Sequence, residues 1–153
     1  MTLTADEKAE ITAKFGKDER DKSVTTIRLV VLALAFVELM QLAHQILLLL
    51  HLIGFAALLG GVLVQLRSKE PEVNAAMLHG SLTLLITGIA LVAVEEIGPD
   101  PVNHVKIATK LVVAAIVVLL VVKNRKFASI PRGLWGLIGG LTIVNAAVAV
   151  LWQ

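Results

Sequence analysis

Residues 107–122 have the sequence IATKLVVAAIVVLLVV, an apolar run whose one charged side chain is Lys110. A helix needs roughly 20 mostly apolar residues to cross the hydrocarbon core of a bilayer. Other runs come close to that length, and they cover Ile46–Leu66, Ala75–Val94 and Leu134–Trp152. Together these runs predict an all-α fold, an integral membrane bundle of four transmembrane helices.

The composition favours the same class. Hydrophobic residues make up 57% of the 153 residues and charged residues 17%, so a soluble domain would expose too much apolar surface. The formal net charge of +2 gives no general attraction to nucleic acid, which is not an expected partner. The absence of cysteine excludes disulfides and thiolate chemistry. The expected surroundings are the lipid bilayer.

Residues 1–28 form a charged segment with an N-terminal amphipathic helix in this prediction. Thr4 can cap the helix, with Glu7 as the partner in a capping box. Gly16 is expected to end it, and Lys17–Thr26 is expected to be a charged connector.

The next stretch, Ile27–Leu66, contains no proline and no glycine before Gly54. One helix of about 40 residues would rise roughly 60 Å, about twice the hydrocarbon thickness. Two interpretations of residues 29–45 therefore stay open. They form a fifth span that ends in a turn near Glu38–Gln45, or an apolar helix that lies on the membrane or on a partner. Residues 46–153 form the four-span bundle in both.

The distribution of bases predicts the orientation in the plasma membrane. Loops 67–72 and 123–133 carry lysine and arginine, whereas loop 95–101 carries acids and no base. The positive-inside rule places the two basic loops in the cytoplasm, and the acidic loop and the C-terminus outside. The bases of residues 1–28 favour a cytoplasmic location for that segment too, which requires the fifth span.

Small residues at helical spacing predict close packing between helices. The positions are Ala57 and Gly61, Gly80 and Gly88 in the second run, and Gly136 and Gly140. Ordinary packing inside the bundle is the simplest interpretation. Asn145, near the middle of the last run, is expected to form a hydrogen bond to another helix, with threonines 83, 87 and 142 as candidate partners.

His51 and His104 are the candidate ligands for a haem or copper. In the predicted topology both lie near the outer face, where Glu95 and Glu96 could support a site. The alternative is that they are ordinary interfacial histidines. Lys110 lies inside the third run, where a charge is costly. It marks a functional position, or it snorkels to the interface and pairs with one of these two acids.

The chain carries two resemblances, which meet near His44–Leu47. The first residues resemble the start of the bacterial small-subunit ribosomal protein S-fifteen, through Leu3-Thr4-Ala5, Lys8, Glu10-Ile11, Lys14-Phe15-Gly16, Asp18 and Asp21. The rRNA-gripping loop of that family has no counterpart here, so the resemblance transfers no RNA-binding residue. The resemblance covers residues 1–43, and ribosome or RNA association through the N-terminal segment, residues 1–28, is kept as a lesser hypothesis.

Residues 47–152 resemble an uncharacterised family of small four-span membrane proteins from actinobacteria. The family is distantly similar to copper-resistance and SirB-like membrane proteins. The matching stretches are Leu50–Gly61, Ala76–Ser81, Leu85–Gly88, Val102–Ile107, Lys110, Leu134-Trp135, Leu141-Thr142 and Asn145. The two resemblances together indicate a chimera-like chain.

No phosphate loop, metalloprotease motif or serine–histidine–acid order stands out, so no enzymatic activity and no catalytic residue are predicted. The leading hypothesis is a non-enzymatic membrane protein that packs against itself, as a homo-oligomer, or against a larger membrane complex. Haem or copper binding is the alternative.

Overall fold

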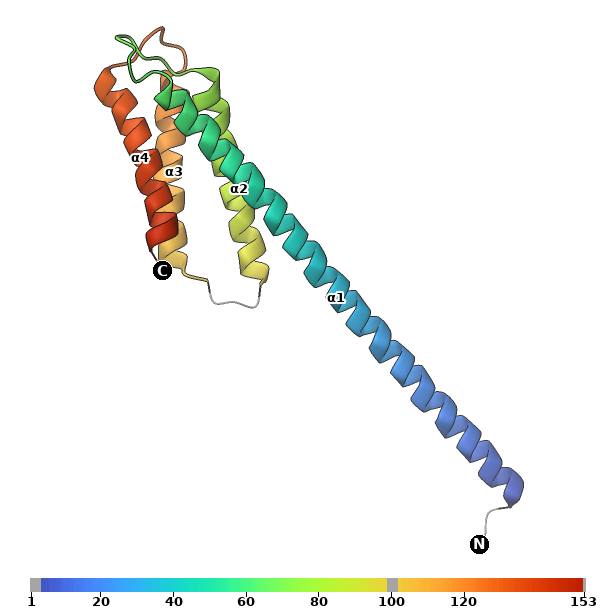
Figure 1. Ribbon diagram of the computed structural model, residues 1–153. Coiled ribbons are helices and arrows are strands. Elements are labelled where there is room, and N and C mark those ends of the chain that lie inside the picture. The colour runs from blue at the N-terminus through green and yellow to red at the C-terminus, as the bar shows by residue number, and fades with distance from the viewer. Residues whose placement is uncertain (1–3, 99–101, 153) are drawn as a thin grey trace. The chain divides into compact units, whose positions relative to one another are not determined.

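The computed structural model describes residues 4–98 and 102–152, and every regular element in these ranges is α-helical. Figure 1 shows the helices in chain order: α1 (Ala5–Leu63), α2 (Ala75–Ile97), α3 (His104–Asn124) and α4 (Arg132–Leu151). Each of the four is long and apolar enough to cross a membrane. The predicted all-α fold with four apolar helices is therefore confirmed. Residues 99–101 of the acidic turn lie outside the described residues.

The chain divides into two compact units, Met1–Leu42 and Ala43–Gln153. In the first unit, the predicted capping box is present at the start of α1. The backbone N–H and the hydroxyl of Thr4 each donate to the Glu7 carboxylate at 2.8 Å, and the Glu7 N–H donates back to Thr4 Oγ1 at 3.4 Å. These donors hold the pKa of the Glu7 carboxyl below its ordinary value.

The expected breaks in α1 were wrong. The helix does not end at Gly16, residues 17–26 are helical, and the turn near Glu38–Gln45 that a fifth span required is absent. One glycine costs a helix only about 1 kcal/mol, and the Lys22–Asp18 ion pair at 2.7 Å spans one turn soon after it. Neither glycine nor proline occurs again before Gly54, so nothing in the sequence interrupts the helix.

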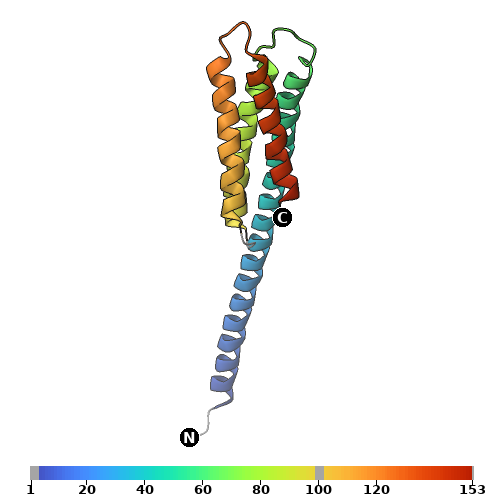
Figure 2. The same ribbon diagram turned by 90° about the vertical axis from the view of Figure 1, so that its left-hand side faces the viewer.

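The second unit is an antiparallel bundle built from the C-terminal part of α1 and from α2, α3 and α4 (Figures 1 and 2). The helices approach closely where a glycine faces a neighbour. An ideal Cβ at Gly61 would lie 2.8 Å from Met77 on α2, and one at Gly139 would lie 2.8 Å from Val62. The second contact brings α4 back to α1 and closes the bundle.

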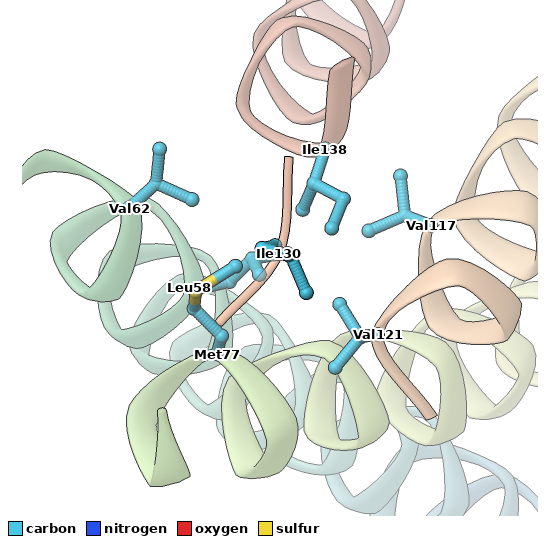
Figure 3. Packing of buried hydrophobic residues seen from close by; sticks show 7 residues of the cluster. All are labelled: Leu58, Val62, Met77, Val117, Val121, Ile130 and Ile138. Carbon is cyan, nitrogen blue, oxygen red and sulfur yellow. The ribbon is translucent and has the colours of Figure 1, made fainter. Parts of the chain in front are cut away.

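The hydrophobic core lies at one end of the bundle, near the α1–α2 and α3–α4 turns. Figure 3 shows its buried side chains, which come from every helix and from the last turn: Leu58, Val62, Met77, Val117, Val121, Ile130 and Ile138. The two turns are joined to each other, because the Ile130 N–H donates to the Pro71 carbonyl at 2.7 Å. This end of the bundle is therefore closed and well packed.

Two amides brace the α1–α2 turn. Gln65 donates to the Glu72 carbonyl at 3.0 Å and accepts from the Glu72 N–H at 2.8 Å. Asn74 caps α2 by accepting from the Met77 N–H, and it also donates to the Gly61 carbonyl at 2.9 Å. These bonds satisfy backbone groups at both helix ends and fix the register between α1 and α2.

Candidate functional site

The opposite half of the bundle contains a cavity of about 370 Å³, within the range of small-molecule sites. All four helices line it, and most of its walls are apolar. Its polar lining residues are His44, His51, Ser81, Glu95, Lys110, Thr142 and Asn145. The bundle thus has a packed half, which contains the hydrophobic core, and a hollow half, which begins at the core residues Leu58 and Val117 and ends toward the acidic loop and the end of α4.

His51 is held on the wall of the cavity by α2. Its Nδ1 lies 2.9 Å from Thr87 Oγ1, and Gly88 leaves room for the ring, since an ideal Cβ at Gly88 would lie 3.3 Å from His51 Cε1. The Thr87 hydroxyl donates its hydrogen to the Thr83 carbonyl at 2.6 Å. With that hydrogen on Thr83, Thr87 Oγ1 is an acceptor for an Nδ1–H of His51, and in this tautomer Nε2 carries a lone pair.

His51 lies deeper than the sequence suggested. The topology prediction put it near the outer face, at the start of a helix, but α1 begins far upstream. The antiparallel register sets Gly61 against the first turn of α2 and His51 against Thr87, near the middle of that helix. Ile46, where the predicted apolar run begins, does not mark the start of a helix, because α1 is helical from Ala5 onward.

The structure does not bring His51 and His104 to the same partners. His104 stands at the start of α3, where its Nδ1 lies 3.2 Å from Glu96 Oε1, and it does not line the cavity. Among residues 4–98 and 102–152, no group of three histidine or acidic side chains could hold a metal ion. The two predicted ligands therefore occupy separate environments.

Lys110 lines the cavity together with Glu95. The predicted ion pair with an acid of the α2 end is not formed within the described residues, where the pairs within 4.0 Å belong to Lys22 and His104. Lys110 lies four residues before Ala114, which also lines the cavity, so both residues are on the side of α3 that faces the interior of the bundle.

Asn145 also lines the cavity, but its expected hydrogen bond to a threonine is absent. Its Oδ1 is buried and has no partner among the described residues. Thr142, one of the expected partners, donates to the Ile138 carbonyl of its own helix at 2.8 Å. Ser81 does the same toward Leu78 at 3.0 Å. These hydroxyls turn their hydrogens to the backbone and leave their oxygens as acceptors.

The predicted packing glycines fall into two groups. Gly61 lies against Asn74 and Met77, whereas Gly80 lies against the backbone of α1, and an ideal Cβ at Gly80 would be only 2.5 Å from the Leu58 nitrogen. Ala57 is half-buried on α1. Gly136 and Gly140 are exposed on α4, and a Cβ at either would meet no atom of the described residues within 4 Å. They contribute nothing to packing within the bundle.

Sequence reasoning missed several members of the site. Gly54 and Gly139 pack helices together, and His44 and Ser81 line the cavity. A signal was available in the spacing: His44 and His51 are seven residues apart and Thr142 and Asn145 three, so each pair shares one face of its helix. A polar pair on one face of an apolar helix indicates a polar interior surface.

Comparisons with known proteins give no match: no family model, no curated protein and no solved structure matches this chain. The two resemblances described above therefore stay predictions, and the function is argued from the residues themselves.

Proposed function

We propose that this chain is a non-enzymatic integral membrane protein whose bundle crosses the plasma membrane and packs against a second copy or a larger membrane assembly. The open glycine face of α4 carries the proposal. Gly136 and Gly140 are one helical turn apart, both are exposed, and no atom of the described chain would meet a Cβ at either. Small residues at this spacing allow two helices to approach closely within a bilayer.

The contrast with the internal glycines supports this proposal. A neighbouring helix fills the space beside each of three internal glycines, Gly54, Gly61 and Gly80. Glycine weakens a helix relative to alanine by roughly 1 kcal/mol, and the α4 pair has no compensating contact inside the bundle. An approaching helix from another chain would provide that compensation. Exposed Ile143 and Val144, on the next turn of α4, offer apolar surface beside it.

The apolar exterior supports a location in the membrane. Large hydrophobic side chains are exposed on the outside of every helix of the bundle, for example Leu52, Ile86, Leu119 and Leu137. Such a surface would be unfavourable in water and is favourable in lipid. The proposed orientation follows the basic loops, with the packed end of the bundle toward the cytoplasm and the C-terminus outside.

The test is the assembly state of the purified full chain in a mild detergent and in lipid nanodiscs. The double variant Gly136→Leu, Gly140→Leu is compared with the wild type and with Gly60→Leu, a control whose Cβ would also meet no atom within 4 Å. We expect the wild type and the control to form a dimer or a larger complex and the double variant to be a folded monomer. A monomeric wild type without a copurifying protein would contradict the proposal.

Haem or copper binding through His51 and His104 stays a separate hypothesis, which the separation of their partners does not favour. Absorbance in the Soret region and metal analysis of the purified protein test it directly. RNA association of the N-terminal segment is also untested, and salt-sensitive RNA binding by the full chain is its readout.

A further inference from the structure

We infer that the cavity in the hollow half of the bundle binds a neutral, lipid-soluble molecule whose head group donates an O–H hydrogen bond. This binding site does not depend on the assembly proposed above. Its walls come from all four helices of a single chain. The inference rests on the apolar lining, on the balance of charge and on the hydrogen-bonding character of the polar groups.

The polar groups of the walls include several acceptors beside the Lys110 ammonium, which donates. The hydroxyl hydrogens of Ser81 and Thr142 are taken by their own helices, so their oxygens can only accept. His51 uses its Nδ1 hydrogen on Thr87 and keeps a lone pair on Nε2, which has no partner among the described residues. Asn145 Oδ1 is buried and unpaired. These acceptors call for a ligand that supplies a hydrogen.

The unpaired oxygen of Asn145 is the strongest of these observations. A buried polar atom without a partner costs stability, so nearly all such atoms in folded proteins are paired. Asn145 lines the cavity, so its buried carbonyl oxygen would be satisfied if the side chain turned toward an occupant that donates to it. The ligand head group is therefore expected to sit beside Asn145.

The charge of the walls favours a neutral occupant. The formal charges of Lys110 and Glu95 cancel, and the lining histidines, His44 and His51, add none when their rings are neutral. An additional charge in an apolar enclosure would be costly without a partner of opposite sign. Leucine, valine and alanine form most of the remaining wall and suit an apolar body. A phenol and an aliphatic alcohol share this chemistry.

The probes for the test are 4-octylphenol, its methyl ether 4-octylanisole, and 1-dodecanol. Each is titrated calorimetrically into the full chain in nanodiscs, and the heat of partition into empty nanodiscs is subtracted. The ether keeps the oxygen and the shape of the phenol but lacks the donor. We expect saturable binding of 4-octylphenol, and about tenfold weaker binding of the ether, the effect of one hydrogen bond. Binding of 1-dodecanol identifies aliphatic alcohols as ligands, and its failure restricts the class to phenols.

The variants Asn145→Leu and Ala146→Phe test the location. Asn124→Leu is the matched control, because Asn124 bonds to its own helix at the packed end of α3. We expect Asn145→Leu to abolish the preference for the phenol over the ether and to raise the melting temperature, since an unpaired acceptor is removed. Ala146→Phe should fill the cavity and abolish saturable binding. The control should bind as the wild type does.

A structural role for Asn145 predicts the opposite shift, a lower melting temperature. The inference is overturned if 4-octylphenol does not saturate, if the ether binds equally well, or if Asn145→Leu and Asn124→Leu bind alike. If Ala146→Phe fails to fold, Asn145→Leu and the phenol–ether pair still decide the question.

Discussion

His51 Nδ1 and Thr87 Oγ1 lie 2.9 Å apart, and they join α1 to α2 in the middle of the bundle. Thr87 is buried, and its own hydrogen is committed to the Thr83 carbonyl. The pair therefore holds the position of the histidine and favours the tautomer with its hydrogen on Nδ1.

Substitution of Thr87 is expected to weaken the bundle. Thr87→Val preserves the shape but leaves the His51 N–H without an acceptor. We expect a loss of about 0.6 to 1.7 kcal/mol in the free energy of unfolding, the range for hydrogen bonds between membrane helices. Thr87→Ser keeps the hydroxyl and should lose less. Denaturant unfolding in mixed micelles, followed by circular dichroism, measures both, and equal losses would argue against the bond.

The contact at Gly80 should tolerate no side chain. A Cβ there would lie 2.5 Å from the Leu58 nitrogen and 2.8 Å from the Gly54 carbonyl oxygen, and backbone atoms cannot turn away as a side chain can. We expect Gly80→Ala to cost about 1 to 3 kcal/mol, as overpacking usually does.

The control for that substitution is Gly133→Ala on α4, where a Cβ meets no atom within 4 Å. It should leave the stability unchanged or raise it slightly, because alanine is the better helix former. Thermal unfolding in the same micelles compares the two variants. An unchanged melting temperature for Gly80→Ala would show that α1 and α2 do not approach as closely as described.

The start of α1 should respond to acid. Thr4 donors lower the pKa of Glu7 in the folded chain, so the cap stabilises the helix fully above the ordinary glutamate pKa of about 4.3. That contribution is lost as the pH falls through the lowered pKa. The ¹³Cα chemical shifts of Thr4–Lys8, followed by NMR on the full chain, should lose helical character below about pH 4. In Glu7→Gln this loss should be absent, and the same acid response in both proteins would contradict the assignment.

The apolar runs were sufficient to predict the number and type of the bundle helices. The run Ala75–Val94 became α2, Ala75–Ile97, and the Asn74 cap explains why its start was predicted correctly. The continuity of α1 was not predicted, because the thickness of a bilayer suggested a turn that the residues themselves do not encode. The lack of helix-breaking residues determined the length of α1, and the thickness of a bilayer did not.

The cavity could not be predicted from one sequence. It depends on which faces of four helices meet, and therefore on a register set by close glycine contacts and by the bracing of the turns. Lys110 and Asn145 were recognised as unusual residues within apolar runs, but their common location on one cavity required the structure. His51 and His104 were grouped by predicted depth, and the actual register separated their partners.

Cysteine labelling in intact cells tests the central claim, that four helices of this chain cross the plasma membrane, most directly. The sequence contains no cysteine, so single cysteines at Thr12, Ser68 and Asn103 give no background from the chain itself. With a membrane-impermeant maleimide, we expect labelling at Asn103 and Thr12, and labelling at Ser68 only after the cells are lysed. Equal labelling of Ser68 and Asn103 in intact cells, or protection of Thr12 while Asn103 reacts, would contradict a four-span bundle with this orientation.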